Sequence, residues 1–295
     1  MTLETPFAYF GKKTRAAGKI WSLLGDPSHY IEPFCGSAAV LLNRPGEWAS
    51  RFETINDNNF FISNFWRAVK HAPDTLADQI KIPPSEVELT ALHSYLYGVA
   101  VEGERFRERL LSDCDYYDPT IAARWCYFAA NSLRDNPVGR KPCKGTLVSS
   151  TRGLSALKWR DPEHYIPLLA RRLQHVRIRY GGWERALTPV HLRDNPAIYF
   201  DPPYVGYENV YGLAEFDSEP LIEFCARHSD LRIVISGYDS EYDALLAYGY
   251  RKEKSRANIA GGTLANKTAA SESLWGSPAC SGAPVNLDGQ YALPL

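Results

Sequence analysis

Short apolar segments alternate with longer amphipathic segments at the start of the chain. Residues 30–34 ("YIEPF") and 52–56 ("FETIN") have the length and composition of buried strands. Between them, residues 35–42 ("CGSAAVLL") form a small-residue turn that opens a helix at Ser37, and residues 60–72 predict an amphipathic helix. This alternation of strands and helices favours a parallel sheet that is covered on both faces.

The pattern changes after residue 72 and returns about a hundred residues later. Helical runs such as "EVELTALHSYLYGVA" and "TIAARWCYFAANSL" come first, and an irregular stretch rich in Gly, Pro, Ser and basic residues follows. We therefore predict one α/β domain made of residues 1–72 and 169–295. A mainly helical insertion over residues 73–168 interrupts it.

The last part of the chain again carries strand patterns. The predicted strands are "VRIRYGG" from Val176, "AIYF" over 197–200 and "LRIVISGY" over 231–238. The segment "SEYDALLAYG" that follows them predicts a helix. Residues 257–273, rich in Gly, Ala, Ser and Thr, predict a mobile loop between late strands.

Composition excludes several classes of protein. The chain has 295 residues, of which 45% are hydrophobic and 23% are charged, as in ordinary soluble globular proteins. None of the six cysteines forms a CxxC pair or lies at zinc spacing with a histidine, which favours reduced thiols in a cytosolic protein. The N-terminus lacks a signal-peptide layout and no apolar run approaches the length of a membrane span, so we expect neither a secreted nor a membrane protein.

The stretch "YFDPPYVGY" over residues 199–207 joins a strand to a possible catalytic group. Prolines cannot continue a sheet ladder, so the strand must end at Asp201, where ligands bind in open α/β sheets. A carboxylate and a backbone carbonyl that accept both hydrogens of an exocyclic amine would free its lone pair for attack. Tyr204 could stack on a base, which is worth about 1–3 kcal/mol. A capped turn without a ligand is the alternative.

Two further strand ends carry polar or flexible residues. In "EPFCGS" a tight turn at Gly36 precedes a helix, and such an N-terminus suits the carboxylate of an amino-acid-like cofactor or a phosphate. Asp57 in "NDNN" follows the second strand about twenty residues later, where an acid commonly accepts the hydroxyls of a ribose. Asp57 also fits the role of a helix N-cap. Gly36 and Asp57 at this spacing favour a nucleoside-containing cofactor. Ribose binding and helix capping both stay open for Asp57.

Together these elements resemble the DNA N6-adenine methyltransferases in which the cofactor motif precedes the recognition domain and DPPY follows it. "YFGKK" over residues 9–13 resembles the family's N-terminal Gly-Gly-Lys element. "EPFCGS" resembles its motif for S-adenosylmethionine (AdoMet), "NDNN" its ribose-binding acid and "FDPPY" its catalytic tetrad. "ESLWGSP" over residues 272–278 is similar to the closing strand of many phage-type members. The elements span nearly the whole chain in the family's order.

The resemblance implies the fold, namely a Rossmann-like methyltransferase sheet with helices on both faces and an inserted helical recognition domain. It also implies roles for the matching residues, in which the acid and the first proline carbonyl bind the adenine amine and the tyrosine stacks on the flipped base. The implied catalytic residues are Asp201, Pro202, Pro203 and Tyr204. The implied AdoMet-binding residues are Tyr9, Gly11, Lys13, Glu32, Phe34, Gly36 and Asp57.

Two positions depart from the family's pattern. Ala38 stands where the family usually has a second glycine, and Lys12 stands within the Gly-Gly pair before the lysine. Alanine tolerates a positive φ poorly, so it could crowd the cofactor unless the backbone shifts. These departures keep open a second hypothesis, a DNA-binding homologue whose methyl transfer is weakened or lost.

Positive charge is concentrated in residues 131–160, although the formal net charge of the chain is −1. This stretch contains seven basic residues and only one acid, Asp135, and glycines and prolines lie between them in the sequence. A solvated basic loop is one interpretation, and contact with DNA phosphates is the one that the DPPY motif favours. The candidate DNA-binding residues are Arg134, Arg140, Lys141, Lys144 and Arg152.

We therefore predict a site-specific enzyme that transfers the methyl group of AdoMet to N6 of an adenine flipped out of duplex DNA. N4 methylation of cytosine is the nearest alternative, and Asp201 favours adenine because cytosine enzymes more often carry serine there. An RNA or small-molecule methyltransferase is a third option. The seven histidines are scattered and indicate no metal site. We expect a monomer or weak dimer, encoded by a bacterium or phage and acting in the host cytoplasm.

Overall fold

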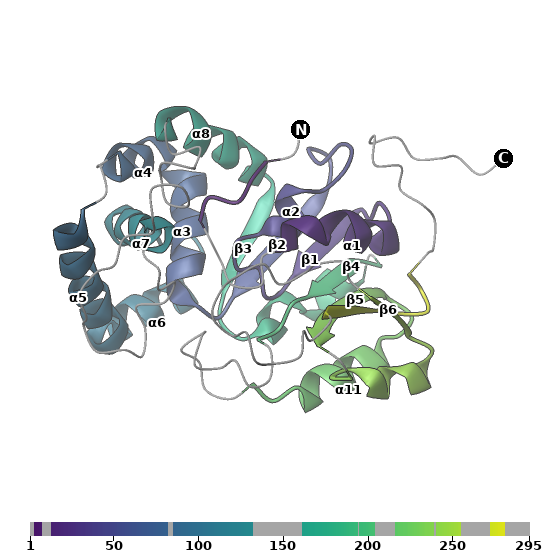
Figure 1. The fold of residues 1–295 in the computed structure, drawn as a ribbon. Coiled ribbons are helices and arrows are strands. Elements are labelled where there is room, and N and C mark those ends of the chain that lie inside the picture. Colours follow the sequence, from purple (N-terminus) through teal and green to yellow (C-terminus); the bar gives the residue numbers. More distant parts are fainter. Residues whose placement is uncertain are drawn as a thin grey trace.

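A seven-stranded sheet forms the centre of the computed structural model (Figure 1). The structure describes residues 3–7, 13–81, 85–131, 161–193, 195–203, 216–238, 240–254 and 272–280. The strands are β1 His29–Glu32, β2 Phe52–Asp57, β3 Val176–Tyr180, β4 Ala197–Phe200, β5 Arg232–Tyr238, β6 Arg251–Lys254 and β7 Glu272–Gly276. Their order in the sheet is β3-β2-β1-β4-β5-β7-β6. Only parallel pairs join the first five strands in this order, and β7 runs antiparallel to both β5 and β6.

Helices fill the segments between the strands. The α-helices are α1 Ala17–Leu24, α2 Ala39–Leu42, α3 Phe60–His71, α4 Pro73–Ile80, α5 Glu86–Glu102, α6 Glu104–Ser112, α7 Pro119–Asn131, α8 Pro162–Leu173, α9 Pro189–Leu192 and α11 Glu219–Arg227. The 3₁₀-helices are η1 Lys13–Arg15, η4 Trp183–Ala186 and η5 Asp243–Tyr248. None of the described helices is long and apolar enough to cross a membrane.

The predicted elements agree with the structure apart from three details. The helix predicted to open at Ser37 begins two residues later as α2. The helix predicted over "SEYDALLAYG" is the short 3₁₀-helix η5. Most of the predicted loop over 257–273 lies outside the described residues, but its last two residues, Glu272 and Ser273, belong to strand β7.

Alternate residues of each strand point to opposite faces of the sheet, and each face packs into its own hydrophobic core. In β4, Ala197 and Tyr199 join the core formed with α1, α2, α3 and α8. Ile198 and Phe200 join the core formed with α11, η4 and η5. Burial on both faces explains why the central strands read as continuous apolar runs. The α/β sheet with helices on both faces is therefore confirmed.

The inserted helices extend the first core away from the sheet. Figure 1 shows α4, α5, α6 and α7 gathered at the β3 end of the molecule, far from α11 and β6. Apolar residues of α4, α5 and α7 belong to the same continuous core as Phe61 and Phe65 of α3. Helix α8 crosses the predicted boundary at residue 168. The division into two domains stays a prediction.

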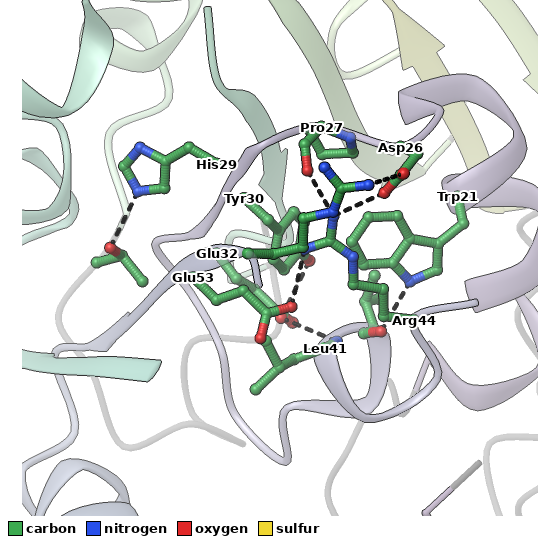
Figure 2. A network of polar contacts seen from close by, with 12 residues as sticks. Trp21, Asp26, Pro27, His29, Tyr30, Glu32, Leu41, Arg44 and Glu53 are labelled. Atoms are coloured by element: carbon green, nitrogen blue, oxygen red, sulfur yellow. Dashed lines mark hydrogen bonds and ion pairs between the residues drawn. The ribbon is translucent and has the colours of Figure 1, made fainter. Parts of the chain in front are cut away.

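A buried charge network fixes α2 and α8 to the sheet. Glu53 of β2 accepts hydrogen bonds from Arg44 at 3.0 Å and from Arg172 of α8 at 2.9 Å. Arg44 also pairs with Asp26 at 3.1 Å and donates to the Pro27 carbonyl, as Figure 2 shows. The three side chains of the central Glu53, Arg44 and Arg172 are each at most 3% exposed, so these charges depend on one another for stabilisation.

Candidate active site

The carboxyl ends of β1 and β4 lie side by side in the middle of the sheet. β1 pairs with β2 on one side and with β4 on the other, so the winding of the chain changes direction between β1 and β4. In open α/β sheets, ligands bind in the crevice at such a point. Glu32 is the last residue of β1, and Asp201 directly follows β4. The two acids therefore lie at one edge of the sheet, as the sequence predicts for strand ends.

A lysine from the N-terminal segment contacts Asp201. The Lys13 ammonium lies 2.8 Å from Oδ1 of Asp201 and 3.0 Å from Oε1 of Glu272, the first residue of β7. Burial by itself lowers the pKa of Lys13, but the attraction of the two carboxylates outweighs it, and the pKa is raised. Lys13 is therefore charged at neutral pH. The structure brings it to the DPPY acid, while its predicted contact with the cofactor stays a prediction.

Glu32 is buried at this edge. Its Oε2 accepts hydrogen bonds from the Tyr30 hydroxyl at 3.0 Å and from the Leu41 N–H at 3.3 Å, a contact that Figure 2 shows. Burial raises the pKa of Glu32 to about 8, although the hydrogen bond from Tyr30 lowers it. Glu32 is then largely protonated near pH 7 and adds little negative charge beside Asp201. It fixes the start of α2 to the end of β1.

The glycine turn and the second strand are joined through Asp57. Oδ2 of Asp57 accepts from the Gly36 N–H and Oδ1 from the Asn59 N–H, both at 2.8 Å. The N-cap of α3 is Asn59, whose side chain accepts from the Phe61 N–H, so Asp57 is not the cap that the sequence allowed. Burial raises the pKa of Asp57 to about 6, and the two backbone hydrogen bonds limit the rise.

Other side chains hold the turn between β1 and α2 in place. Trp66 of α3 donates to the Gly36 carbonyl at 3.0 Å. Asn56 donates to the carbonyls of Pro33 at 3.0 Å and Gly181 at 2.9 Å, which ties the ends of β1, β2 and β3 together. The Phe34 ring lies 5.6 Å from that of Phe216 and 6.3 Å from that of Phe200. Phe34 therefore forms part of an aromatic wall next to the DPPY segment.

The structure explains why the family prefers glycine where this chain has Ala38. Ala38 has φ 51° and ψ 34°, the left-handed conformation, and it is fully buried. This conformation costs an L-residue about 1–2 kcal/mol, and glycine adopts it without that cost. The departure noted in the sequence is therefore a strained position at the start of α2.

We expect Ala38→Gly to be far less destabilising than Ala68→Gly. Both alanines are fully buried, so each substitution removes one buried methyl group, but Ala68 lies inside α3. Glycine costs about 1 kcal/mol inside a helix and relieves strain at a left-handed position. The free energies of unfolding of the two variants, measured by urea denaturation, should differ by about 2 kcal/mol. Equal losses would contradict a strained Ala38.

Several predicted site residues lie outside the described part of the chain. They are Tyr9, Gly11, Tyr204, Arg134, Arg140, Lys141, Lys144 and Arg152, as well as Lys12. The sequence predicts no role for Glu272, which lies in the segment that resembles the closing strand. Its signal was an acid at the first position of an otherwise buried, apolar strand. The described residues contain no group of three or more His, Cys, Asp or Glu that could hold a metal ion.

A protein-family model matches most of the chain. The model of a family described as D12 class N6 adenine-specific DNA methyltransferase matches residues 9–229, well over half of the chain. The matched range contains the turn after β1, Asp57 and the segment after β4. No curated protein matches the chain significantly.

Proposed function

Because the chain belongs to the D12 class N6 adenine-specific DNA methyltransferase family, we propose that the edge formed by β1, β2 and β4 is its active site. The enzyme methylates N6 of adenine in DNA at specific sites. The proposal adds AdoMet as the methyl donor, a flipped adenine from duplex DNA as the acceptor, and residue roles at this edge. The position of Asp201 at the winding change between β1 and β4 is the observation that supports it most.

The turn after β1 and the end of β2 fit a nucleoside-containing donor. Asp57 is 9% exposed, and each of its carboxylate oxygens accepts one backbone hydrogen bond and retains a lone pair for a ribose hydroxyl. Gly36, whose N–H contacts this carboxylate, has no side chain of its own to cover it. Bound AdoMet supplies a methyl group on a positively charged sulfur. Glu32, Phe34 and Gly36 would shape the pocket around it.

Asp201 and Pro202 would hold the adenine amine. The side chain of Asp201 is 20% exposed, so it can be reached from the crevice while Lys13 contacts its Oδ1. A carboxylate has about four lone-pair sites, and the Lys13 contact at Oδ1 occupies one of them. The Pro202 carbonyl would accept the second hydrogen, and Pro203 would keep the turn rigid. Because the amine is inaccessible in stacked DNA, the base must flip out of the helix, where Tyr204 would stack on it.

The amine nitrogen would gain positive charge as its bond to the methyl carbon forms and the carbon–sulfur bond of the donor breaks, and it would then release a proton to water. The Asp201 carboxylate lies where this charge develops and would stabilise it without having to reorganise. The segment over residues 73–168 would recognise the target, and its basic residues would contact DNA phosphates.

Transfer of labelled methyl groups tests the proposal directly. The protein is incubated with labelled AdoMet and unmethylated duplex DNA, and the DNA is then digested to nucleosides. Label in N6-methyl-2′-deoxyadenosine supports the proposal, provided that unlabelled duplex DNA competes for transfer better than single-stranded DNA or RNA does. Label in N4-methylcytosine, or tight DNA binding without transfer, contradicts it and favours the alternatives that the sequence left open.

We expect the affinity for AdoMet to fall as the pH drops below about 6, the pKa to which burial raises Asp57. A ribose hydroxyl needs the ionised carboxylate as acceptor, so binding follows the ionised fraction and weakens about tenfold per pH unit below the pKa. Calorimetric titration with AdoMet between pH 4.5 and 8 measures this. Asp57→Asn should bind weakly at every pH, and the steep dependence below pH 6 should disappear. An equal pH dependence in both proteins would contradict the ribose contact.

A further inference from the structure

Three charged side chains from distant parts of the chain meet beside the proposed adenine site. Lys13 comes from η1, Asp201 follows β4, and Glu272 begins β7. Lys13 bridges the two carboxylates at 2.8 Å and 3.0 Å. Neither the proposed chemistry of Asp201 nor the family match assigns a role to Glu272, which lies beyond the matched residues 9–229.

Sheet topology explains how Glu272 reaches this edge. β7 runs antiparallel to its neighbours, so its first residue lies at the edge where the parallel strands end. Glu272 pairs with Tyr238, the last residue of β5, and β5 lies next to β4. The amino end of the inserted antiparallel strand therefore brings an acid to the carboxyl ends of the catalytic strands.

The charges of the three groups decide what Asp201 can do. Lys13 is 4% exposed and the Glu272 side chain 7%, so water screens their interaction little. Lys13 alone would neutralise Asp201, and a neutral pair stabilises a developing positive charge poorly. With Glu272 included, the three groups carry a net charge of about −1. The second carboxylate thus holds Lys13 in place and keeps the cluster negative toward the amine.

We propose that Glu272 is a positioning residue of the methyl transfer, which acts on Asp201 through Lys13. This inference rests on the proposed role of Asp201. Lys13 orients the Asp201 carboxylate by occupying Oδ1, and Glu272 anchors the same ammonium through its ion pair at 3.0 Å. Glu272 thereby raises the rate of the transfer step and contributes little to the binding of DNA or AdoMet.

Glu272→Gln tests this inference, because glutamine keeps the size and the acceptor oxygen but removes the charge. We expect kcat to fall about 10- to 100-fold, less than on loss of a group that touches the reacting atoms. The dissociation constants for DNA and AdoMet should change less than threefold, and Glu272→Asp should recover part of the rate. Glu253→Gln is the matched control, since Glu253 of the neighbouring strand β6 pairs with Lys19 at 2.9 Å in an exposed position. It should leave kcat unchanged.

A second variant shows whether Glu272 acts through Lys13. If it does, Lys13→Met/Glu272→Gln loses no more activity than the more severe of the two single variants, because nothing remains for Glu272 to hold. The double variant also leaves no unpaired lysine, so it remains informative if Glu272→Gln folds poorly. Additive losses, or an unchanged kcat in folded Glu272→Gln, overturn the inference.

The failure of this inference can be told apart from that of the proposed function. If Glu272→Gln is fully active while Asp201→Asn is inactive, the proposed function stands and the role of Glu272 falls. If the unaltered protein transfers no methyl group to adenine, both fall. A fall in DNA affinity that accounts for the whole loss of activity would mark Glu272 as a structural residue and would also overturn its role in transfer.

Discussion

Asp201→Asn is expected to lower kcat for adenine methylation by about 10²–10³-fold, the cost of removing one preorganised group that stabilises charge in a transition state. Asparagine has nearly the same shape as aspartate but no charge, and its amide can turn an N–H toward the amine. The Lys13 ammonium would then lose its ion pair with Asp201 and keep the one with Glu272. Single-turnover transfer of labelled methyl to a duplex, followed by nucleoside identification, measures the effect on the chemical step.

The control for this variant is another aspartate that pairs with a lysine. Asp243 of η5 accepts hydrogen bonds from Lys252 at 2.8 Å and from the Trp275 indole at 3.0 Å. Its side chain is 36% exposed, against 20% for Asp201. Asp243→Asn should leave kcat within about twofold, because screened surface pairs contribute little. If Asp201→Asn retains more than about a tenth of the activity while bound to DNA and AdoMet, Asp201 does not hold the amine.

The strand ends were predictable because each is marked by local chemistry. Prolines after "AIYF" and within "YIEPF" cannot continue a ladder, and the structure ends β4 and β1 at those places. The conformation of Ala38 was also foreseeable, since a residue that replaces glycine in a turn inherits its backbone. These features depend on a few neighbouring residues, so one sequence carries them.

Contacts between distant segments were not predictable in the same way. Lys13 and Glu272 meet because of the strand order β4-β5-β7, and no local pattern encodes that order. Family resemblance therefore predicts a cofactor contact for Lys13, and no pattern in the sequence predicts a role for Glu272. The helix predicted over "SEYDALLAYG" forms only a 3₁₀-helix, whose tighter hydrogen bonds suit short segments.

The burial of a charged side chain is a second feature that the hydrophobic pattern of the sequence does not predict. Glu53 lies within the strand "FETIND", where an acid at an alternate position normally indicates a solvent-facing residue. The structure buries it because Arg44, two residues after the end of α2, and Arg172 of α8 both pair with it. Glu53 is therefore a buried charged residue because of tertiary contacts with Arg44 and Arg172.

We therefore expect Glu53→Gln to lower the free energy of unfolding by about 3–5 kcal/mol, as when one partner of a buried ion pair is removed. Glutamine leaves two buried guanidinium groups without their shared counter-charge. Arg44 keeps its ion pair with the partly exposed Asp26. Urea denaturation followed by fluorescence measures the loss. Glu253→Gln, which breaks the exposed pair with Lys19, should cost less than about 1 kcal/mol.

The same substitution should also weaken the turn between β1 and α2 before the protein unfolds. Arg172 donates to the Leu41 carbonyl at 2.8 Å, and the Leu41 N–H donates to Glu32, so one peptide group links the network to the end of β1. Loss of Glu53 frees Arg172 to shift, and α2 with the strained Ala38 moves with it. Amide hydrogen exchange over residues 35–42 should therefore rise in Glu53→Gln under native conditions, while exchange in α11 on the opposite face stays unchanged. An equal rise of exchange in both segments would mean that the network stabilises the fold as a whole and does not act on the turn.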